Sequence, residues 1–216
     1  MAQQKKVRIL SLDGGGIRGI IPATIIQYAE AYLQKKRPGT TIADHFDFIA
    51  GTSTGGILTG IYLAPQKEDN TKAKFSATEA LKFYVDNGYD IFNASKISGL
   101  KRFWGLGSAV KFNPRNLEKL LHEKLGDLKM SELIKPCLIT TYNMAQKSSF
   151  FFTSIEDTAK REFFVHDVLR STSAAPTYFP PAKIKNLATG PQKETTFSTM
   201  INLDGGVFAN NPTMCA

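Results

Sequence analysis

Apolar positions in the first part of the chain change between the short runs typical of strands and the spacing typical of helices. An apolar run at residues 7–12 predicts a buried strand, and residues 20–36 predict an amphipathic helix. A second apolar run at residues 46–50 precedes a second helical pattern at residues 53–63. The apolar positions of the first helix include Ile21, Ile25, Tyr28 and Tyr32. This order favours the α/β class, with a mostly parallel sheet and helices on both faces.

The remaining patterns extend the same kind of domain. Helices are expected at residues 77–87, 114–125 and 165–173, and strands at residues 136–142, 149–153 and 196–203. Asn113 and Pro114 suit the N-cap and the first turn of one of these helices. Residues 66–76 are polar and residues 98–111 are rich in glycine and aromatics, so both stretches are expected to be loops. We predict a three-layer α/β/α domain over residues 1–216.

Composition narrows the class of protein without naming a partner. The chain has 216 residues, 42% hydrophobic and 21% charged, which excludes a disordered chain, and its apolar runs are too short to span a bilayer. The net charge of +8 suits an anionic membrane surface, whereas the scattered basic residues match no nucleic-acid module. Cys137 and Cys215 have no motif spacing. The first apolar run stops at Asp13, too early for a signal peptide, so a cytoplasmic protein is expected.

A candidate nucleophile lies between the second strand and its helix. Residues 51–55 match the pattern G-x-S-x-G, with Ser53 at the centre and Gly51 and Gly55 on either side. A serine on such a sharp turn projects its hydroxyl above the sheet, and the flanking glycines permit the turn. The helix that follows favours negative charge near its first residues. The motif alone is also compatible with a plain strand-to-helix turn.

The loop after the first strand is a second candidate for chemistry. Asp13 is followed by Gly14, Gly15 and Gly16, whose backbone N–H groups can point together at one anion. An enzyme that cleaves esters needs such donors for the oxyanion of its tetrahedral intermediate.

The same glycines also match the dinucleotide-binding fingerprint G-x-G-x-x-G at Gly14, Gly16 and Gly19. That interpretation requires an acidic residue at the C-terminal end of the second strand. Asp44 and Asp47 lie at the start of this strand instead, which disfavours a nucleotide-binding module.

Asp204 is the candidate base, because it ends a predicted apolar strand and precedes Gly205 and Gly206. A Ser-His-Asp hydrolase of this fold class has its histidine after the acid. All three histidines precede Asp204, namely His45, His122 and His166.

A triad that uses Asp204 in that order is therefore impossible in this chain. Asp127 or Asp157 followed by His166 would keep the order, but no motif supports either pair. The three histidines also lack ligand spacing, so no metal site is expected.

Four segments together make the sequence similar to the patatin-like phospholipase family. Residues 9–23 resemble the family's oxyanion segment and first helix, and residues 46–56 resemble its nucleophile segment. Residues 171–181 resemble its Ala-Ala-Pro segment, and residues 203–207 resemble its Asp-Gly-Gly segment. The four segments occur in the family's order and run along nearly the whole chain.

The resemblance implies a lipid acyl hydrolase that works through Ser53 and Asp204, without histidine, calcium or an organic cofactor. Ser53 would take the acyl group, Asp204 would act as base, and water would hydrolyse the acyl-enzyme. The implied oxyanion donors are the backbone N–H groups of Gly14, Gly15 and Gly16, with Arg18 alongside. The implied substrate is a phospholipid or galactolipid ester at a membrane surface, to which the protein would attach peripherally.

Some expectations stay open from sequence alone. Family members usually continue well beyond the segment around Asp204, so this sequence is a minimal domain or a fragment. A catalytically silent lipid-binding or storage protein remains an alternative to the enzyme, and the nucleotide-binding module is a weaker one. Phe103 and Trp104, beside Lys101 and Arg102, are a candidate for membrane contact. The oligomeric state is not predicted.

Overall fold

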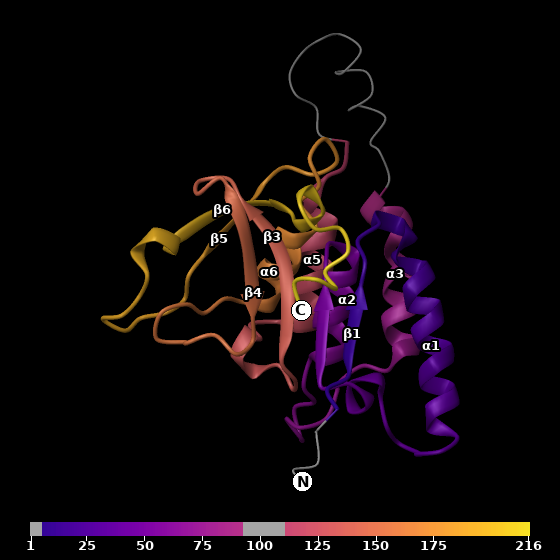
Figure 1. The fold of residues 1–216 in the computed structure, drawn as a ribbon. Helices are drawn as coiled ribbons and strands as arrows, with labels where there is room; N and C mark the ends of the chain where they lie inside the picture. The colour runs from indigo at the N-terminus through magenta and orange to yellow at the C-terminus, as the bar shows by residue number, and fades with distance from the viewer. Residues whose placement is uncertain (1–5, 93–110) are drawn as a thin grey trace.

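A computed structural model describes residues 6–92 and 111–216 of the chain, which form a sheet with helices packed on it (Figure 1). The strands are β1 (Ile9–Leu12), β2 (Phe48–Gly51), β3 (Cys137–Asn143), β4 (Ser148–Thr153), β5 (Ala182–Lys185) and β6 (Thr199–Asp204). The helices are α1 (Ile20–Gln34), α2 (Thr54–Leu63), α3 (Ala77–Phe92), α5 (Pro114–Leu125) and α6 (Val165–Thr172). The predicted α/β class is confirmed.

The six strands form one mixed sheet in which β1, β2, β3 and β5 run in one direction and β4 and β6 run in the other. Strand β4 occupies one edge of β3 from Leu138 to Asn143. Strands β2 and β6 therefore share the other edge of β3 and approach it from opposite directions. Gly51 at the end of β2 pairs with Ile139, and Asp204 at the end of β6 pairs with Thr141. This register brings the ends of two strands that are distant in sequence next to each other.

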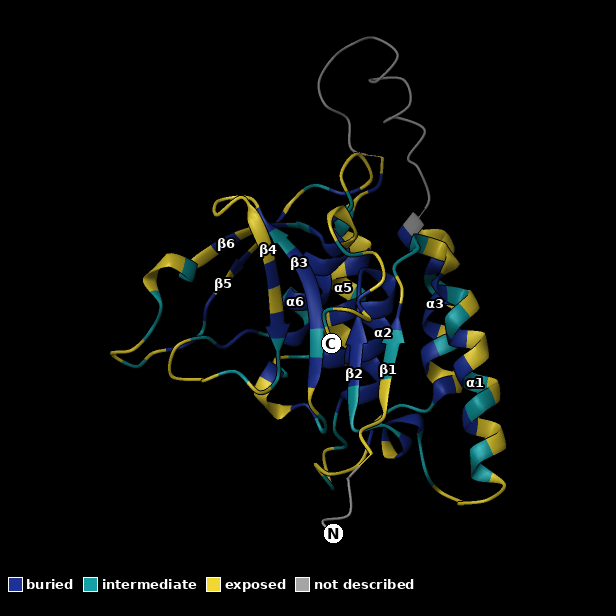
Figure 2. Cartoon of the chain, viewed as in Figure 1, coloured by how far each residue is buried: buried dark blue, intermediate teal, exposed yellow. Residues whose placement is uncertain are grey.

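Helix α2 is the centre of the core. Every one of its residues is buried, as Figure 2 shows, and it packs on β1, β2, β3 and α6. A Cβ atom at Gly55 would collide with the carbonyl oxygen of Leu12, so only glycine allows this close approach of helix and strand. Ile57, Leu58 and Ile61 are almost completely buried, and each contributes roughly 1.5–3 kcal/mol of hydrophobic free energy. This packing holds the N-terminus of α2 firmly against the end of β2.

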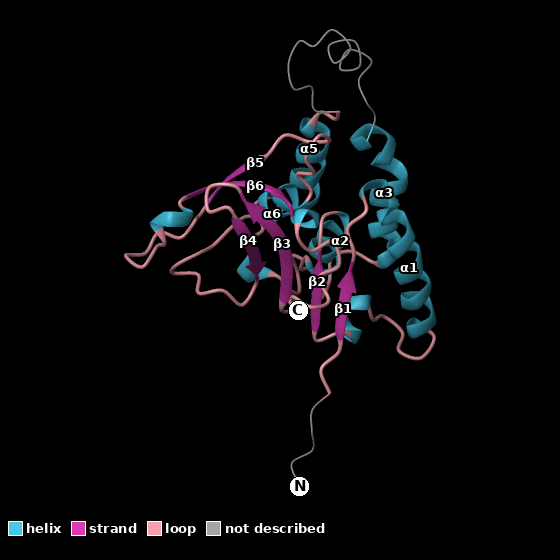
Figure 3. Ribbon diagram, turned by 45° about the horizontal axis from the view of Figure 1, so that its top comes forward, coloured by secondary structure: helices cyan, strands magenta, loops and turns pink. Residues whose placement is uncertain are grey.

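Helices α1 and α3 lie side by side at the β1 end of the sheet (Figure 3). Glu30 of α1 is buried and ties this region together, because its carboxylate accepts the backbone N–H groups of Ile42 and Ala77, each at 2.7 Å. The apolar positions that predicted α1 do not face the core. Their exposed fractions are Ile21 59%, Ile25 61%, Tyr28 77% and Tyr32 50%. These four residues form an apolar stripe on the exposed side of α1.

The sequence predictions differ from the structure at several elements. Residues 7–12 were expected to form a buried strand, but β1 lies at the edge of the sheet and only Leu12 in it is buried. Strand β5 was not predicted, because its four residues alternate Ala and Ile with lysine in a short stretch between loops. Residues 98–110 of the expected loop, with Phe103 and Trp104, lie outside the described residues. Within the described residues, every helix is too short or too polar to cross a membrane.

Candidate active site

Ser53 lies on a sharp turn between β2 and α2. Its backbone has φ 55° and ψ −121°, a conformation with positive φ that residues other than glycine rarely adopt. Such strain persists only where the surroundings fix it, and here the fully buried α2 does so. Ser53 is 7% exposed, so it is buried among its neighbours and does not lie on the open surface.

Asp204 meets Ser53 across the shared edge of β3. The hydroxyl of Ser53 donates to Oδ2 of Asp204 at 2.6 Å, and the backbone N–H of Gly206 donates to Oδ1 at 2.7 Å. The backbone N–H of Asp204 donates to the carbonyl oxygen of Ala174 at 3.0 Å. Both carboxylate oxygens and the backbone are therefore held in place, and one oxygen points at the serine hydroxyl.

The environment of Asp204 makes it a stronger base than an exposed aspartate. Burial is the largest effect, and it raises the pKa from 3.8 to about 6, although the hydrogen bonds from Ser53 and Gly206 act in the opposite direction. The carboxylate is thus still ionised at neutral pH, and its proton affinity is closer to that of a general base.

Thr172 supports the nucleophile; it lies in the segment of residues 171–181, to which no chemical role was assigned from the sequence. It ends α6, and its Oγ1 accepts the backbone N–H of Ser53 at 2.8 Å. A pair of threonines also lies next to the nucleophile, since the hydroxyls of Thr52 and Thr140 are 2.7 Å apart. Thr172 belongs to the Ser-Thr-Ser run before Ala174, and this run was the available signal. These hydroxyls hold the backbone around Ser53.

The glycine-rich loop after β1 lies beside Ser53, but its glycines are not equivalent. The backbone N–H of Gly14 donates to the carbonyl oxygen of Asn210 at 3.0 Å, so it is already used. The expectation that all three glycines donate to an oxyanion therefore needs correction at Gly14. Gly16 has φ +59°, which bends the loop, and Gly15 accepts the backbone N–H of Arg18 at 3.2 Å. Gly15, Gly16 and Arg18 all line the cleft beside the serine.

The remaining motif glycines shape the backbone on both sides of the pair. Gly51 ends β2, and Gly55 lies in the first turn of α2. Gly205 and Gly206 begin the short 3₁₀ helix (Gly205–Val207) that follows Asp204. A Cβ atom at Gly205 would collide with Thr140, so this turn also depends on the absence of a side chain.

A cleft of about 540 Å³ opens beside Ser53, next to Thr54 and Ser173. Its walls are mostly apolar and are formed by Ile17, Ile57, Phe112, Leu117, Tyr178 and Phe179. Two cations lie on it, Arg18 and Lys111. The ammonium of Lys111 lies 5.3 Å from the ring centre of Phe112 and 5.2 Å from that of Tyr178. The cleft thus combines a long apolar wall with positive charge.

The geometry gives little support to a nucleotide-binding site at the glycine loop or to a catalytic histidine. Asp44 accepts the backbone N–H of Thr41, and Asp47 accepts that of Arg8, so both acids are engaged at the start of β2, away from the glycine loop. Among the described residues no histidine hydrogen-bonds to Ser53 or Asp204. His45 is buried, and its Nε2 lies 3.0 Å from the hydroxyl of Thr40.

The family model described as patatin-like phospholipase matches residues 10–216, which include Ser53, Asp204 and the glycine loop. The chain belongs to the patatin-like phospholipase family. Patatin-like protein 2 of Oryza sativa subsp. japonica is 41% identical over 221 residues, covering 98% of this chain and 52% of that protein. Patatin-like protein 2 of Arabidopsis thaliana is 39% identical over 217 residues, covering 97% and 51%. Patatin-01 of Solanum tuberosum is 36% identical over 182 residues, covering 82% and 44%.

This patatin-like chain spans about half the length of the curated relatives that it matches. Among solved structures, VipD from Legionella pneumophila matches with a TM-score of 0.46 and 13% identity, over 94% of this chain and 46% of that one. A likeness at this level adds nothing to the family assignment, which rests on the sequence matches.

Proposed function

We propose that this patatin-like domain is a lipid acyl hydrolase in which Ser53 attacks a fatty-acyl ester and Asp204 is the base. The observation that carries the proposal is the 2.6 Å hydrogen bond from the Ser53 hydroxyl to Asp204, made by a serine held in a strained turn. Membership of a family described as patatin-like phospholipase supports the reaction class.

In the proposed reaction, the Ser53 hydroxyl loses its proton to Oδ2 of Asp204 as Oγ bonds to the ester carbonyl carbon. The tetrahedral intermediate collapses, the alcohol leaves with that proton, and the acyl group stays on Ser53. Water then attacks the acyl carbon as Asp204 accepts the water proton, the bond from Oγ to the acyl carbon breaks, and Asp204 returns the proton to Ser53 as the fatty acid is released. The pKa of about 6 suits both steps, because the carboxylate is ionised at neutral pH and can still take up a proton.

We place the oxyanion donors at the backbone N–H groups of Gly15 and Gly16, because the N–H of Gly14 is bonded to Asn210. Within the described residues these two N–H groups have no protein acceptor, and both residues line the cleft. Arg18 lies on the same cleft and adds positive charge beside the developing oxyanion.

The cleft suits a glycerolipid with an anionic headgroup. An acyl chain would lie along the apolar wall, where burial of each CH₂ group is worth about 0.8 kcal/mol. Arg18 and Lys111 supply charge for a phosphate, which favours a phospholipid over a neutral galactolipid.

We further propose that the domain reaches its substrate at a membrane surface through the exposed stripe of α1. Ile21 and Ile25 line a hollow of about 430 Å³ together with Gly14, Gly15 and Arg18, so the stripe adjoins the site. Helix α1 contains one acidic residue, Glu30, and it is buried. Basic residues follow the helix, namely Lys35, Lys36 and Arg37. An apolar stripe with cations at its end is complementary to anionic lipid headgroups.

The activity is tested with mixed phospholipid vesicles in the presence of a chelator, with release of fatty acid as the readout. Wild-type protein is expected to release fatty acid, and Ser53→Ala and Asp204→Asn are expected to lose this activity by at least about a hundredfold. Lipid binding without hydrolysis by the wild type would instead support a silent lipid-binding protein. Full activity in Asp204→Asn would show that another group is the base.

The membrane surface is tested by sedimentation with anionic vesicles. The double variant Ile25→Ser, Tyr28→Ser is expected to bind weakly, whereas Val85→Ser, an equally exposed apolar position on α3, should bind like the wild type. Unchanged sedimentation of the double variant would exclude the stripe as the lipid contact. A change in its molecular mass by light scattering would assign the stripe to contact between copies of the chain.

A further inference from the structure

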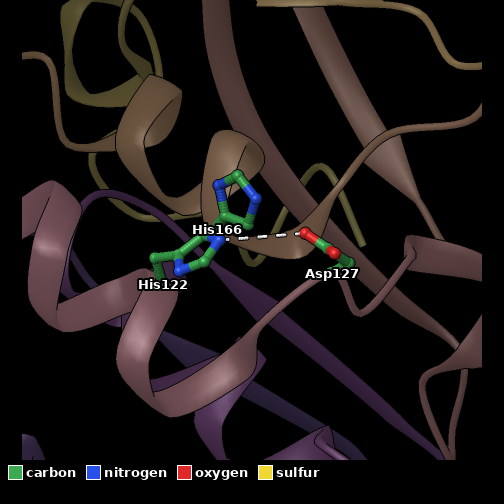
Figure 4. A group of neighbouring side chains, drawn as sticks. All are labelled: His122, Asp127 and His166. Atoms are coloured by element: carbon green, nitrogen blue, oxygen red, sulfur yellow. Dashed lines mark ion pairs between the residues drawn. The ribbon is translucent and has the colours of Figure 1, made fainter.

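A cluster of potential metal ligands lies away from the proposed active site, at the ends of α5 and α6. His122 lies in the last turn of α5, Asp127 follows that helix, and His166 lies in the first turn of α6 (Figure 4). One ligand atom from each residue lies within 4.8 Å of the other two. Nε2 of His122 is 3.8 Å from Oδ1 of Asp127, and the two imidazole ring centres are 5.3 Å apart.

The backbone around this cluster fixes the three segments relative to one another. Gly126 ends α5 with φ +54° and donates its N–H to the carbonyl oxygen of His122 at 2.8 Å, which turns the chain back beside the helix. The N–H of Val165, next to His166, donates to the carbonyl oxygen of Leu128, next to Asp127, also at 2.8 Å. The backbone segments that carry the three residues are therefore held together by hydrogen bonds, whereas the side chains of His122 and Asp127 are 63% and 79% exposed.

The ring of His166 is also oriented by its neighbours. Phe164 stacks on it with a centroid distance of 5.2 Å and an interplanar angle of 16°. Oδ1 of Asp167 lies 3.3 Å from Nδ1 of His166. Metal-binding histidines commonly pair their second ring nitrogen with a carboxylate, which fixes the tautomer and strengthens the ligand. The Asp167 carboxylate therefore lies in position to orient the His166 ring.

We propose that His122, Asp127 and His166 bind a divalent transition-metal ion, with Zn²⁺ as the first candidate. Two imidazoles and one carboxylate are a ligand set that Zn²⁺, Co²⁺ and Ni²⁺ accept, and water completes the coordination. Ligands about 3.5 Å apart suit metal–ligand bonds of about 2.1 Å, so small side-chain rotations close the site. His122 and His166 line a groove of about 720 Å³, which gives the ion a path of entry.

The bound ion would hold α5 against α6. Helix α6 carries His166 in its first turn and ends at Thr172, whose hydroxyl supports the backbone of Ser53. The metal therefore stabilises the helix pair and stands apart from the Ser53–Asp204 pair. It takes no part in the proposed ester cleavage, so the two proposals stand or fall separately.

The test uses the full chain without an affinity tag, stripped with a chelator and dialysed. Titration with ZnCl₂ by calorimetry is expected to show one equivalent bound and a raised melting temperature, and CoCl₂ should give visible absorption bands. His122→Ala, His166→Ala and Asp127→Asn are each expected to weaken binding by roughly tenfold or more.

Two control variants separate binding at this cluster from binding of zinc to exposed carboxylates elsewhere on the surface. Asp86→Asn changes an exposed carboxylate on α3 and should bind zinc like the wild type, as should Ser53→Ala. Circular dichroism checks that each variant is folded. The proposal is overturned if the wild type binds neither zinc nor cobalt, or if the ligand variants bind zinc as tightly as Asp86→Asn.

Discussion

The buried carboxylate of Asp204 is expected to lower the stability of the fold at the pH where the proposed reaction uses it. The side chain is 5% exposed, and burial raises its pKa from 3.8 to about 6. Between about pH 4 and about pH 6 the folded protein therefore holds a proton that the unfolded chain has released. The free energy of unfolding falls as the pH rises through this window. Each tenfold difference in proton affinity is worth about 1.4 kcal/mol, so above this pH window the free energy of unfolding is lower by about 3 kcal/mol.

Asp204→Asn removes the charge and keeps the shape of the side chain. The amide oxygen can still accept the N–H of Gly206, and the amide nitrogen can donate to the Ser53 oxygen. At pH 8 the variant is expected to be more stable than the wild type by up to about 3 kcal/mol, and to melt up to about 10 °C higher. At pH 4 the wild-type carboxyl is protonated and the advantage disappears. Thermal unfolding of both proteins at pH 4, 6 and 8 measures this difference.

Ser53→Ala is the matched control, because it also removes the proposed activity but leaves the charge of Asp204 buried. This variant takes away the hydroxyl that donates to Oδ2, so it is expected to be less stable than the wild type, most of all at pH 8. Wild-type ester hydrolysis should decline below pH about 6, as Asp204 takes up a proton. If Asp204→Asn were more stable than the wild type by the same amount at pH 4 and pH 8, the reasoning would be refuted. The added stability would then have a cause other than the buried charge.

Three further changes test the supports of the site and of the core. Thr172→Val leaves the buried N–H of Ser53 without its acceptor, and a loss of roughly 1–3 kcal/mol in urea unfolding is expected together with a lower kcat. Gly55→Ala places a Cβ atom on the carbonyl oxygen of Leu12, so a loss of roughly 1–3 kcal/mol in the same assay is expected; an unchanged midpoint would contradict the close packing. Glu30→Gln exchanges one of two accepting oxygens for an NH₂ group, and a loss of roughly 1–3 kcal/mol is expected, whereas the exposed Glu123→Gln should unfold like the wild type.

Local patterns predicted most of the secondary structure because each pattern reports the environment of one element. The strand before Ser53, the helix after it and the N-cap at Asn113 all follow from neighbouring residues, and the structure has each of them. The same kind of pattern was misleading for β1, since an apolar run does not say whether a strand lies at the centre or at the edge of a sheet. The apolar pattern also could not show which side of α1 faces the core. In the structure the buried residues of α1 are Ala23, Ile26 and Glu30.

The two constellations of the molecule differ in how far sequence can predict them. Ser53 and Asp204 are 151 residues apart, yet each ends or follows a strand, and strand ends meet at fixed places in a sheet. Motif order and fold class together could therefore predict that these two residues lie close to each other. His122 and His166 meet because α5 packs on α6, through buried leucines whose spacing reveals a helix but not its partner. Along the sequence the three histidines are scattered, and only the packing of helices shows that two of them adjoin a carboxylate.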